Sequence, residues 1–278
     1  MKNLADVVQP VTAFFEIDRQ MHDGRTTSEY LSWLSETLHF FPNAIVFHDQ
    51  SIDSNFISKH KSATFFLCSI QDLPLYFEIS KIRKICDSPI GFQSRDLVYR
   101  SPEYGIVVNS KFHFLSMATK HSSLDFFMWV DAGYSRFSSF SVSSSPIKFT
   151  NLGRFESLFQ LSVKGLIRNL ITSRSNSIEN FCKVGNSTRI LCGISFLLSR
   201  EMIPQAEDVL TSLHNAWLDE GKWDTEQVAI IQVITQLNST FVFEFNNYYD
   251  SMLRYLQNPY IRAANIMASK ALLRIITK

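Results

Sequence analysis

The sequence lacks the features of a membrane or exported protein. No run approaches the about 18 uninterrupted apolar residues that indicate a transmembrane helix. The N-terminal segment carries one lysine and interrupts its apolar residues at Asp6 and Pro10, so it makes a poor signal peptide. The expected location is therefore the cytoplasm.

The chain also lacks an excess of charge of either sign. Lysine plus arginine total 27 against 26 aspartate plus glutamate, which gives a formal charge of +1. This balance argues against a nucleic-acid binder that works through a general basic surface, and we expect no nucleic-acid partner. Hydrophobic residues make up 45% of the 278 residues, enough for a sizeable folded core.

The cysteines lack the spacing of a metal site. The four of them, Cys68, Cys86, Cys182 and Cys192, form no CxxC or CxxH pair, which argues against structural zinc. In a chain of this length an even count alone does not indicate a disulfide scaffold. We expect reduced, mostly buried thiols.

Strand-like and helix-like segments alternate along the chain. Strands are predicted at 10–15, 43–49, 63–70, 124–131, 189–199 (interrupted by Gly193) and 241–245. Helices are predicted at 26–41, 75–87, 105–121, 201–219, 224–237, 248–257 and 260–278. Thr26 or Thr27 is the expected N-cap of the first helix, and GIVV at 105–108 is also compatible with a strand. The alternation predicts an α/β fold with a largely parallel sheet.

Two predicted strands end on an acid, Asp49 and Asp131. Ligands of open α/β sheets bind beyond the carboxyl ends of the strands, so both positions are candidate sites. A carboxylate there can ligate Mg²⁺ or Mn²⁺, and Ala132 and Gly133 would leave space for a bulky ligand. The structural alternative is an acid that caps a turn or the next helix.

Six segments resemble, in the same order, the HtrL/YibB family of bacterial proteins. They are VTAFFEIDR, RTTSEYLSWL, IVFHD, SPEYGIVVNSKFHFL, FMWVDAGYSRF and WDTEQVAI, of which WVDAGY is the most specific. The resemblance covers the chain from about residue 10 to 260. The family includes members encoded among surface-polysaccharide genes and is related to glycosyltransferases of the GT-A type.

The resemblance implies one GT-A-like domain over 1–278 and a hexosyltransferase activity. Residues 1–135 would form the nucleotide-binding half, 146–259 the acceptor-side half, and 260–278 a basic amphipathic helix. The donor would be a nucleotide-sugar, expected to be UDP-linked. The acceptor would be a surface glycan or glycolipid of the lipopolysaccharide, capsule or O-antigen kind.

A metal site at Asp131 is also implied by the resemblance. GT-A enzymes bind Mn²⁺ or Mg²⁺ through a DxD-like motif, and Asp131 would be its leading acid. Gly133 stands where the motif has its second acid. Donor binding without a metal therefore stays open beside the metal-dependent alternative.

WDTEQVAI supplies two further catalytic candidates, Asp224 and Glu226. Asp224 followed by Gln227 is similar to a capping box, which is its structural alternative. Glu226 falls in the first helical turn without being needed as the cap. By resemblance it would act on the acceptor hydroxyl as a general base.

The remaining candidates would contact the donor. By resemblance Thr12, Phe14 and Phe15 border the base, although the two phenylalanines also suit the core. Arg19 and Arg25 would reach the diphosphate through charge-assisted hydrogen bonds, and Lys111 would compensate phosphate charge. A surface position is the alternative for these three. Asp49 with His48 would contact ribose or base, His48 being otherwise structural, and Gly193 would let a sugar approach the backbone.

The C-terminal helix and two rival functions complete the predictions. Arg262, Lys270, Arg274 and Lys278 would form a basic stripe that rests on the inner membrane, or a docking helix with a solvated edge. The main rival to the transferase is a non-catalytic GT-A-like protein that binds a sugar or a partner in glycan assembly. A metal-dependent phosphotransferase using Asp131 is the third alternative.

Overall fold

The computed structural model describes most of the chain. The described residues are 2–3, 6–17, 19–89, 96–137, 148–149, 157–162, 191–237 and 240–244. The helices predicted at 248–257 and 260–278, with their basic stripe, lie outside them. Among the described helices, none combines the length and the apolar character that crossing a bilayer requires.

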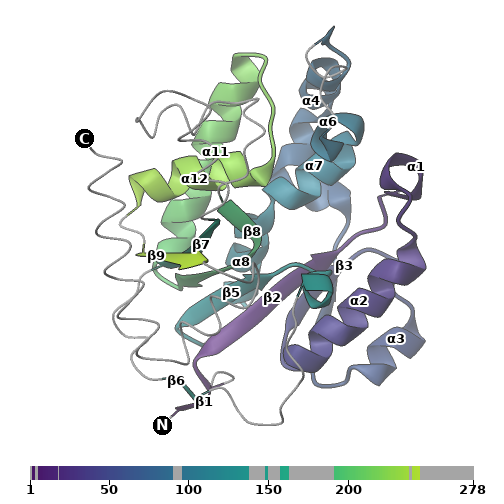
Figure 1. Ribbon diagram of the computed structural model, residues 1–278, viewed down its shortest axis with the longest axis vertical. Coiled ribbons are helices and arrows are strands. Elements are labelled where there is room, and N and C mark those ends of the chain that lie inside the picture. Colours follow the sequence, from purple (N-terminus) through teal and green to yellow (C-terminus); the bar gives the residue numbers. More distant parts are fainter. Residues whose placement is uncertain are drawn as a thin grey trace.

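The main sheet has seven strands in the order β4-β3-β2-β5-β8-β7-β9 (Figure 1). Their bounds are β2 Val8–Phe14, β3 Ile45–His48, β4 Thr64–Leu67, β5 Phe126–Val130, β7 Ser157–Ser162, β8 Leu191–Ser199 and β9 Thr240–Glu244. β4, β3, β2 and β5 pair in parallel, β8 runs antiparallel to β5 and β7, and β7 pairs in parallel with β9. A separate antiparallel pair joins β1 Lys2–Asn3 to β6 Lys148–Phe149. The predicted α/β fold with a mostly parallel sheet is confirmed.

The strand order reverses between β2 and β5. From β2 the chain moves outward through β3 to β4, and it then returns to the other side of β2 as β5. Such a reversal leaves a crevice at the carboxyl ends of the two strands, where open α/β sheets bind ligands. The fold therefore directs attention to the residues that follow β2 and β5.

Helices cover both faces of the sheet (Figure 1). Their bounds are α1 Arg19–Asp23, α2 Thr27–Phe40, α3 Ser54–Lys59, α4 Ile79–Cys86, α6 Leu97–Arg100, α7 Pro102–Asn109, α8 Lys111–Thr119, α11 Met202–Asp219 and α12 Glu226–Gln236. Short 3-10 turns lie at η2 Ile70–Asp72, η3 Pro74–Glu78 and η4 Tyr134–Phe137. α2 packs on one face of the sheet, and α8, α11 and α12 pack on the other.

The alternation of β5 decides on which side its acid lies. Met128 and Val130 join the core beneath α2, whereas Phe127 and Trp129 join the core that contains α8. Because side chains alternate along a strand, Asp131 continues the series of Trp129 toward the α8 face. The Trp129 ring stacks on Phe114 of α8, with centroids 5.9 Å apart.

The helix predicted at 105–121 is wrong in one respect, since it is two helices. α7 ends and α8 begins at Ser110, whose φ of −95° and ψ of 11° lie outside the helical range. The Ser110 hydroxyl donates to the carbonyl of Ile106, four residues earlier, at 2.7 Å, which is a contact that often bends helices. The break makes Lys111 the first residue of α8.

Two other expectations concern single residues. Thr26 is the N-cap of α2, and it forms a full capping box with Glu29. Gly193 does not interrupt its strand, because β8 is continuous from 191 to 199. Instead the register of β7 against β8 shifts between the pairs Phe159–Phe196 and Leu161–Leu191, which places Gly193 in a bulge.

Candidate functional site

A cavity of about 650 Å³ opens at the carboxyl ends of β2 and β5. Its wall includes Phe14 and Phe15 from the end of β2, and Trp129 and Asp131 from the end of β5. The volume falls in the usual range for small-molecule sites. The cavity thus lies where the strand order predicts a ligand, and its basic lining residues are Arg19, Arg25, Lys111 and Arg136.

Asp131 is held in the cavity wall by its own strand. Its backbone N–H donates to the carbonyl of Ile194 in β8 at 2.8 Å, which extends the pairing beyond Val130. The indole Nε1 of Trp129 donates to Asp131 Oδ1 at 2.6 Å. The carboxylate is therefore fixed in direction while its side chain stays 33% exposed toward the cavity.

Lys111 lies between two carboxylates. Its ammonium Nζ is 2.9 Å from Asp131 Oδ1 and 3.2 Å from Glu226 Oε1, and it donates to the carbonyl of Gly193 at 2.7 Å. An ammonium has three donors, so the three contacts use all of them. The side chain is 3% exposed, and the alternative of a surface lysine is therefore wrong.

The charge of Lys111 is stabilised by the same contacts. Burial alone would lower the pKa of Lys111, but the carboxylates of Asp131 and Glu226 raise it above its usual value. Because the pKa rises on folding, the ammonium contributes its stability at every pH below its unfolded pKa of about 10.5. Lys111 thus acts as a permanent cation of the site at neutral pH.

Glu226 reaches Lys111 from the start of α12. Thr225 is the N-cap of this helix, and Asp224 Oδ1 accepts from the backbone N–H of Thr225 at 2.7 Å. The capping box suggested by Asp224 and Gln227 does not form. Asp224 is buried and does not line the cavity, whereas Glu226 does.

Gly193 makes room for Glu226. A Cβ at position 193 would lie 2.7 Å from Glu226 Oε1, closer than such contacts allow. The glycine in the bulge of β8 therefore serves two purposes, since its carbonyl accepts from Lys111 and its bare Cα admits the carboxylate. Gly133 lines the cavity too, and a Cβ there would meet Arg136 Nε at 3.1 Å.

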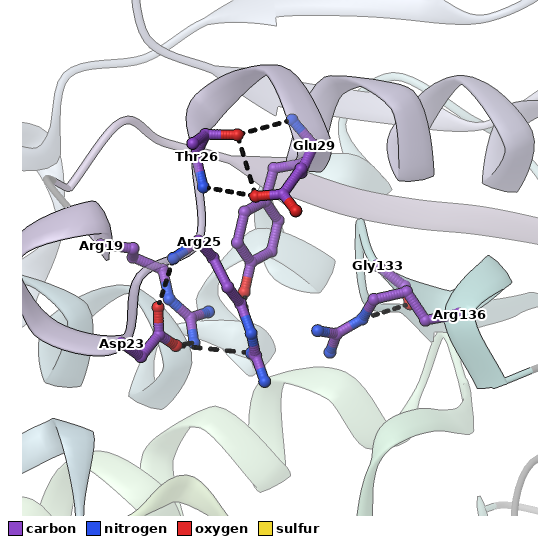
Figure 2. Close-up of polar contacts among 8 residues, drawn as sticks. Arg19, Asp23, Arg25, Thr26, Glu29, Gly133 and Arg136 are labelled. Carbon is purple, nitrogen blue, oxygen red and sulfur yellow. Dashed lines mark hydrogen bonds and ion pairs between the residues drawn. The ribbon is translucent and has the colours of Figure 1, made fainter.

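Three arginines meet at the ring of Tyr30 in the same cavity. The guanidinium carbon of Arg19 lies 4.9 Å and that of Arg136 5.9 Å from the ring centroid, and Arg25 donates to the hydroxyl at 3.3 Å. Asp23 pairs with Arg19 at 2.5 Å and with Arg25 at 3.5 Å. Figure 2 shows the Arg136 side chain pointing toward Arg25, which lies between it and Arg19.

Arg136 was missed by the sequence reasoning, although it stands within the FMWVDAGYSRF segment. Burial lowers its pKa, and the charges of Arg25 and Arg19 lower it further. Its guanidinium also lies 4.5 Å from the ring centroid of Trp33 in α2. The sequence signal for Arg136 was its position three residues after Gly133. The turn η4 brings the chain back there, so that Arg136 Nε donates to the Gly133 carbonyl at 3.4 Å.

Several predicted site residues lie away from the cavity wall. Asp49 accepts from the backbone N–H groups of Glu16 and Ser51 at 2.8 and 2.9 Å, so its carboxylate shapes a turn. Thr12 is buried in β2, and its hydroxyl has no hydrogen-bond partner among the described residues. His48 is buried and shares a hydrogen bond with the carbonyl of Asp49. The contacts give Asp49 and His48 structural roles.

The donor set at Asp131 does not fit a divalent cation held by the protein. The position between Asp131 and Glu226, where such an ion would lie, is filled by the Lys111 ammonium. Gly133 supplies no second carboxylate of the DxD kind. Within the described residues no group of three or more His, Cys, Asp or Glu side chains could hold a metal ion.

Comparison with known proteins identifies the family. A family model described as bacterial protein of unknown function (HtrL_YibB) matches residues 6–149. The chain belongs to the HtrL/YibB family. The matched segment holds WVDAGY and ends before WDTEQVAI, so Gly193 and Glu226 lie outside it. Comparison with curated protein sequences gives no match.

Similar folds occur among solved structures. Core-mannan synthase A from Aspergillus fumigatus, in a Mn/GDP form, matches at 9% identity and a TM-score of 0.48, over 85% of this chain and 72% of the other. A cytidylyltransferase from Leptospira borgpetersenii matches at 9% and 0.40, over 88% and 78%. A putative glucose-1-phosphate thymidylyltransferase from Bacillus anthracis matches at 7% and 0.38, over 94% and 95%. All three matches have identities below 10% and TM-scores below 0.5.

Proposed function

We propose that this HtrL/YibB protein is a glycosyltransferase that moves a sugar from a nucleotide-sugar donor, of the UDP-linked kind, to a bacterial surface glycan. The observation that carries the proposal is the content of the cavity at the reversal of strand order. It unites three guanidinium groups with a carboxylate pair that is bridged by an ammonium. The guanidinium groups would bind the anionic diphosphate of the donor, and one of the carboxylates would act as the base for the acceptor hydroxyl.

The transfer step assigns a role to Glu226. The acceptor oxygen forms a bond to the anomeric carbon while the bond from that carbon to the diphosphate oxygen breaks. The hydroxyl proton passes to Glu226, and the nucleoside diphosphate leaves with the electron pair. Lys111 holds Oε1 at 3.2 Å, so we assign the proton to Oε2.

Asp131 is assigned to the donor sugar. Trp129 and Lys111 both bind its Oδ1, which fixes the plane of the carboxylate. We assign Oδ2 to the binding of the donor sugar. It would accept a charge-assisted hydrogen bond from a sugar hydroxyl. The negative charge that develops on the departing diphosphate faces Arg19, Arg25 and Arg136, whose fixed charges need no reorganisation.

A non-catalytic binding protein is the second candidate. It is favoured by the contacts of Lys111. All three N–H donors of the ammonium bind protein oxygens, and the same arrangement would occur in an ion cluster with a purely structural role. Under this alternative the cavity binds a sugar or nucleotide without turnover. The two candidates differ in whether Glu226 receives a proton.

Calorimetric titration with UDP, GDP and CDP, followed by assays of UDP release from UDP-sugars, tests the proposal. We expect a nucleoside diphosphate to bind, and Glu226→Gln to keep this binding while UDP release falls by about 100-fold or more. Glu220→Gln is the matched control, because Glu220 is exposed and pairs only with Lys222 among the described ion pairs. Absence of nucleotide binding would remove the transferase. Binding without release in the wild type would favour the second candidate.

A further inference from the structure

The cation that a donor diphosphate needs is already part of the chain. In a metal-dependent site a divalent ion lies between protein carboxylates and diphosphate oxygens, and it neutralises both. Here the Lys111 ammonium neutralises Asp131 and Glu226 from within the protein at 2.9 and 3.2 Å. All three N–H donors of Lys111 bind protein oxygens, so none is left for the anion. The positive charge nevertheless reduces the repulsion between the two carboxylates and a bound anion.

The arginine cluster, defined as Arg19, Arg25 and Arg136, is the part of the wall that can contact the anion. Like charges held this close repel one another, as the effect of Arg25 and Arg19 on the pKa of Arg136 indicates. An anion between them would relieve this repulsion. A guanidinium also matches the geometry of phosphate oxygens with paired N–H donors.

A second observation at Arg19 points to a missing partner. Its Nε is a buried donor without a hydrogen-bond partner among the described residues, whereas its Nη2 pairs with Asp23 at 2.5 Å. Buried donors in native proteins are nearly always satisfied by protein, water or ligand. Its guanidinium is also held between two aromatic rings, 4.9 Å from Tyr30 and 4.6 Å from Tyr104, so it is positioned before any ligand arrives.

We propose that this chain binds the diphosphate of its donor through the arginine cluster, with Lys111 in the place of a divalent metal ion. The inference rests on the proposed function and adds that donor binding needs no metal. The Lys111 ammonium takes the place of the metal site that the sequence predicts at Asp131. The ligand is a nucleoside diphosphate group, recognised by its two phosphates.

The test is titration with UDP and with inorganic pyrophosphate, each in excess EDTA and again in Mn²⁺. We expect UDP to bind in EDTA, with an affinity that Mn²⁺ changes by less than about threefold, equivalent to less than 0.7 kcal/mol. Asp131→Asn should bind UDP with the same affinity in EDTA and in Mn²⁺, because no metal is held by that carboxylate. UDP binding that appears only with Mn²⁺ would overturn the inference and leave the proposed function standing.

Variants of the cluster give the second readout. Arg136→Gln should weaken UDP and pyrophosphate by about 10- to 100-fold in EDTA, the loss expected for hydrogen bonds to a charged group, and Arg136→Lys should weaken them less. Arg83→Gln is the matched control, because Arg83 pairs with Glu103 on the surface and does not line the cavity. Equal affinity of Arg136→Gln and wild type would overturn the inference.

Titration with pyrophosphate distinguishes the proposed anion site from the proposed transferase function. Binding of pyrophosphate in EDTA that depends on Arg136, without any binding of UDP, would keep the anion site and remove the nucleotide donor. Binding of neither probe in EDTA or in Mn²⁺ would overturn both. Both results are read by calorimetry on the full chain, so neither depends on knowing the acceptor.

Discussion

The Lys111 ammonium lies 2.9 Å from the Asp131 carboxylate, although Lys111 begins α8 and Asp131 directly follows β5. The contact exists because the break at Ser110 starts α8 with Lys111, and because the alternation of β5 turns Asp131 to the same face. The pair is the centre of the site. Four of the five predictions below act on its neighbourhood.

Removing the cation should destabilise the protein. Lys111→Met keeps the length of the side chain but leaves Asp131 and Glu226 facing each other without a positive charge. Loss of one partner from a buried ion pair costs about 3 kcal/mol or more, and chemical denaturation will measure it. The double variant Lys111→Met with Glu226→Gln should recover part of the loss. A single variant as stable as the wild type would contradict the bridge.

The same variant should acquire a response to Mn²⁺. With the ammonium gone, the two carboxylates form a site for a divalent cation, and binding to the folded state raises the melting temperature. The wild type should show no such increase. Thermal denaturation in EDTA and in Mn²⁺ compares the two proteins directly, and an equal shift in both would contradict the prediction.

Adding one methyl group at Gly193 should displace Glu226. Gly193→Ala places a Cβ 2.7 Å from Glu226 Oε1, and a displacement of about 1 Å can reduce turnover by about 100-fold. UDP affinity should stay close to that of the wild type. Gly105→Ala is the contrasting variant, since its Cβ would meet the buried Trp223 ring at 2.9 Å and should reduce stability by about 1–3 kcal/mol. If Gly193→Ala keeps full UDP release, the crowding argument is wrong.

Much of the fold could be predicted from the sequence because its signals are local. Thr26 followed by Glu29 indicates a capped helix, and the structure shows that capping box. The apolar run before Asp131 indicates a buried strand, and β5 is that strand. Gly193 misled the prediction, because a bulge and a strand break look alike in one sequence.

The site itself was harder to predict, because its contacts are distant in sequence. Lys111 is separated from Gly193 by 82 residues and from Glu226 by 115, and no local pattern reports such a contact. The lysine had the appearance of a surface residue in an otherwise apolar segment. The resemblance named Asp131, but the ammonium beside it follows only from the packing of α8 and α12.

The Trp129–Asp131 hydrogen bond should show a measurable coupling. A double-mutant cycle with Trp129→Phe and Asp131→Ala isolates the 2.6 Å contact from the cavity that each substitution leaves. We expect a coupling free energy of about 1.5–3 kcal/mol, as for a hydrogen bond to a charged group. Additive losses of stability would show that the indole does not fix the carboxylate.

Acid should destabilise the protein through His214. Burial lowers its pKa to about 3, and its Nε2 donates to Asn109 Oδ1 at 3.1 Å. The unfolded chain takes up a proton near pH 6.5 that the folded chain does not bind, so stability is present above that pH and is lost as the pH falls toward 3.

The acid dependence has a definite slope. One proton corresponds to about 1.4 kcal/mol per pH unit between about 6.5 and 3. Urea denaturation at several pH values measures the free energy of unfolding of the wild type and of His214→Gln. Its slope with pH should be smaller in the variant by the contribution of this one proton. His121→Gln, at an exposed position, should keep it. Identical slopes for His214→Gln and wild type would contradict the assignment.

The distance in sequence between Lys111 and its partners has a consequence for synthesis on the ribosome. Asp131 emerges only 20 residues after Lys111 (131 − 111), but the carbonyl of Gly193 and the carboxylate of Glu226 follow much later. A nascent chain that stops before β8 holds the most specific motif of its family and still has no complete site. A premature stop before Glu226 therefore leaves the site incomplete, even where β2, β3, β4 and β5 have already formed.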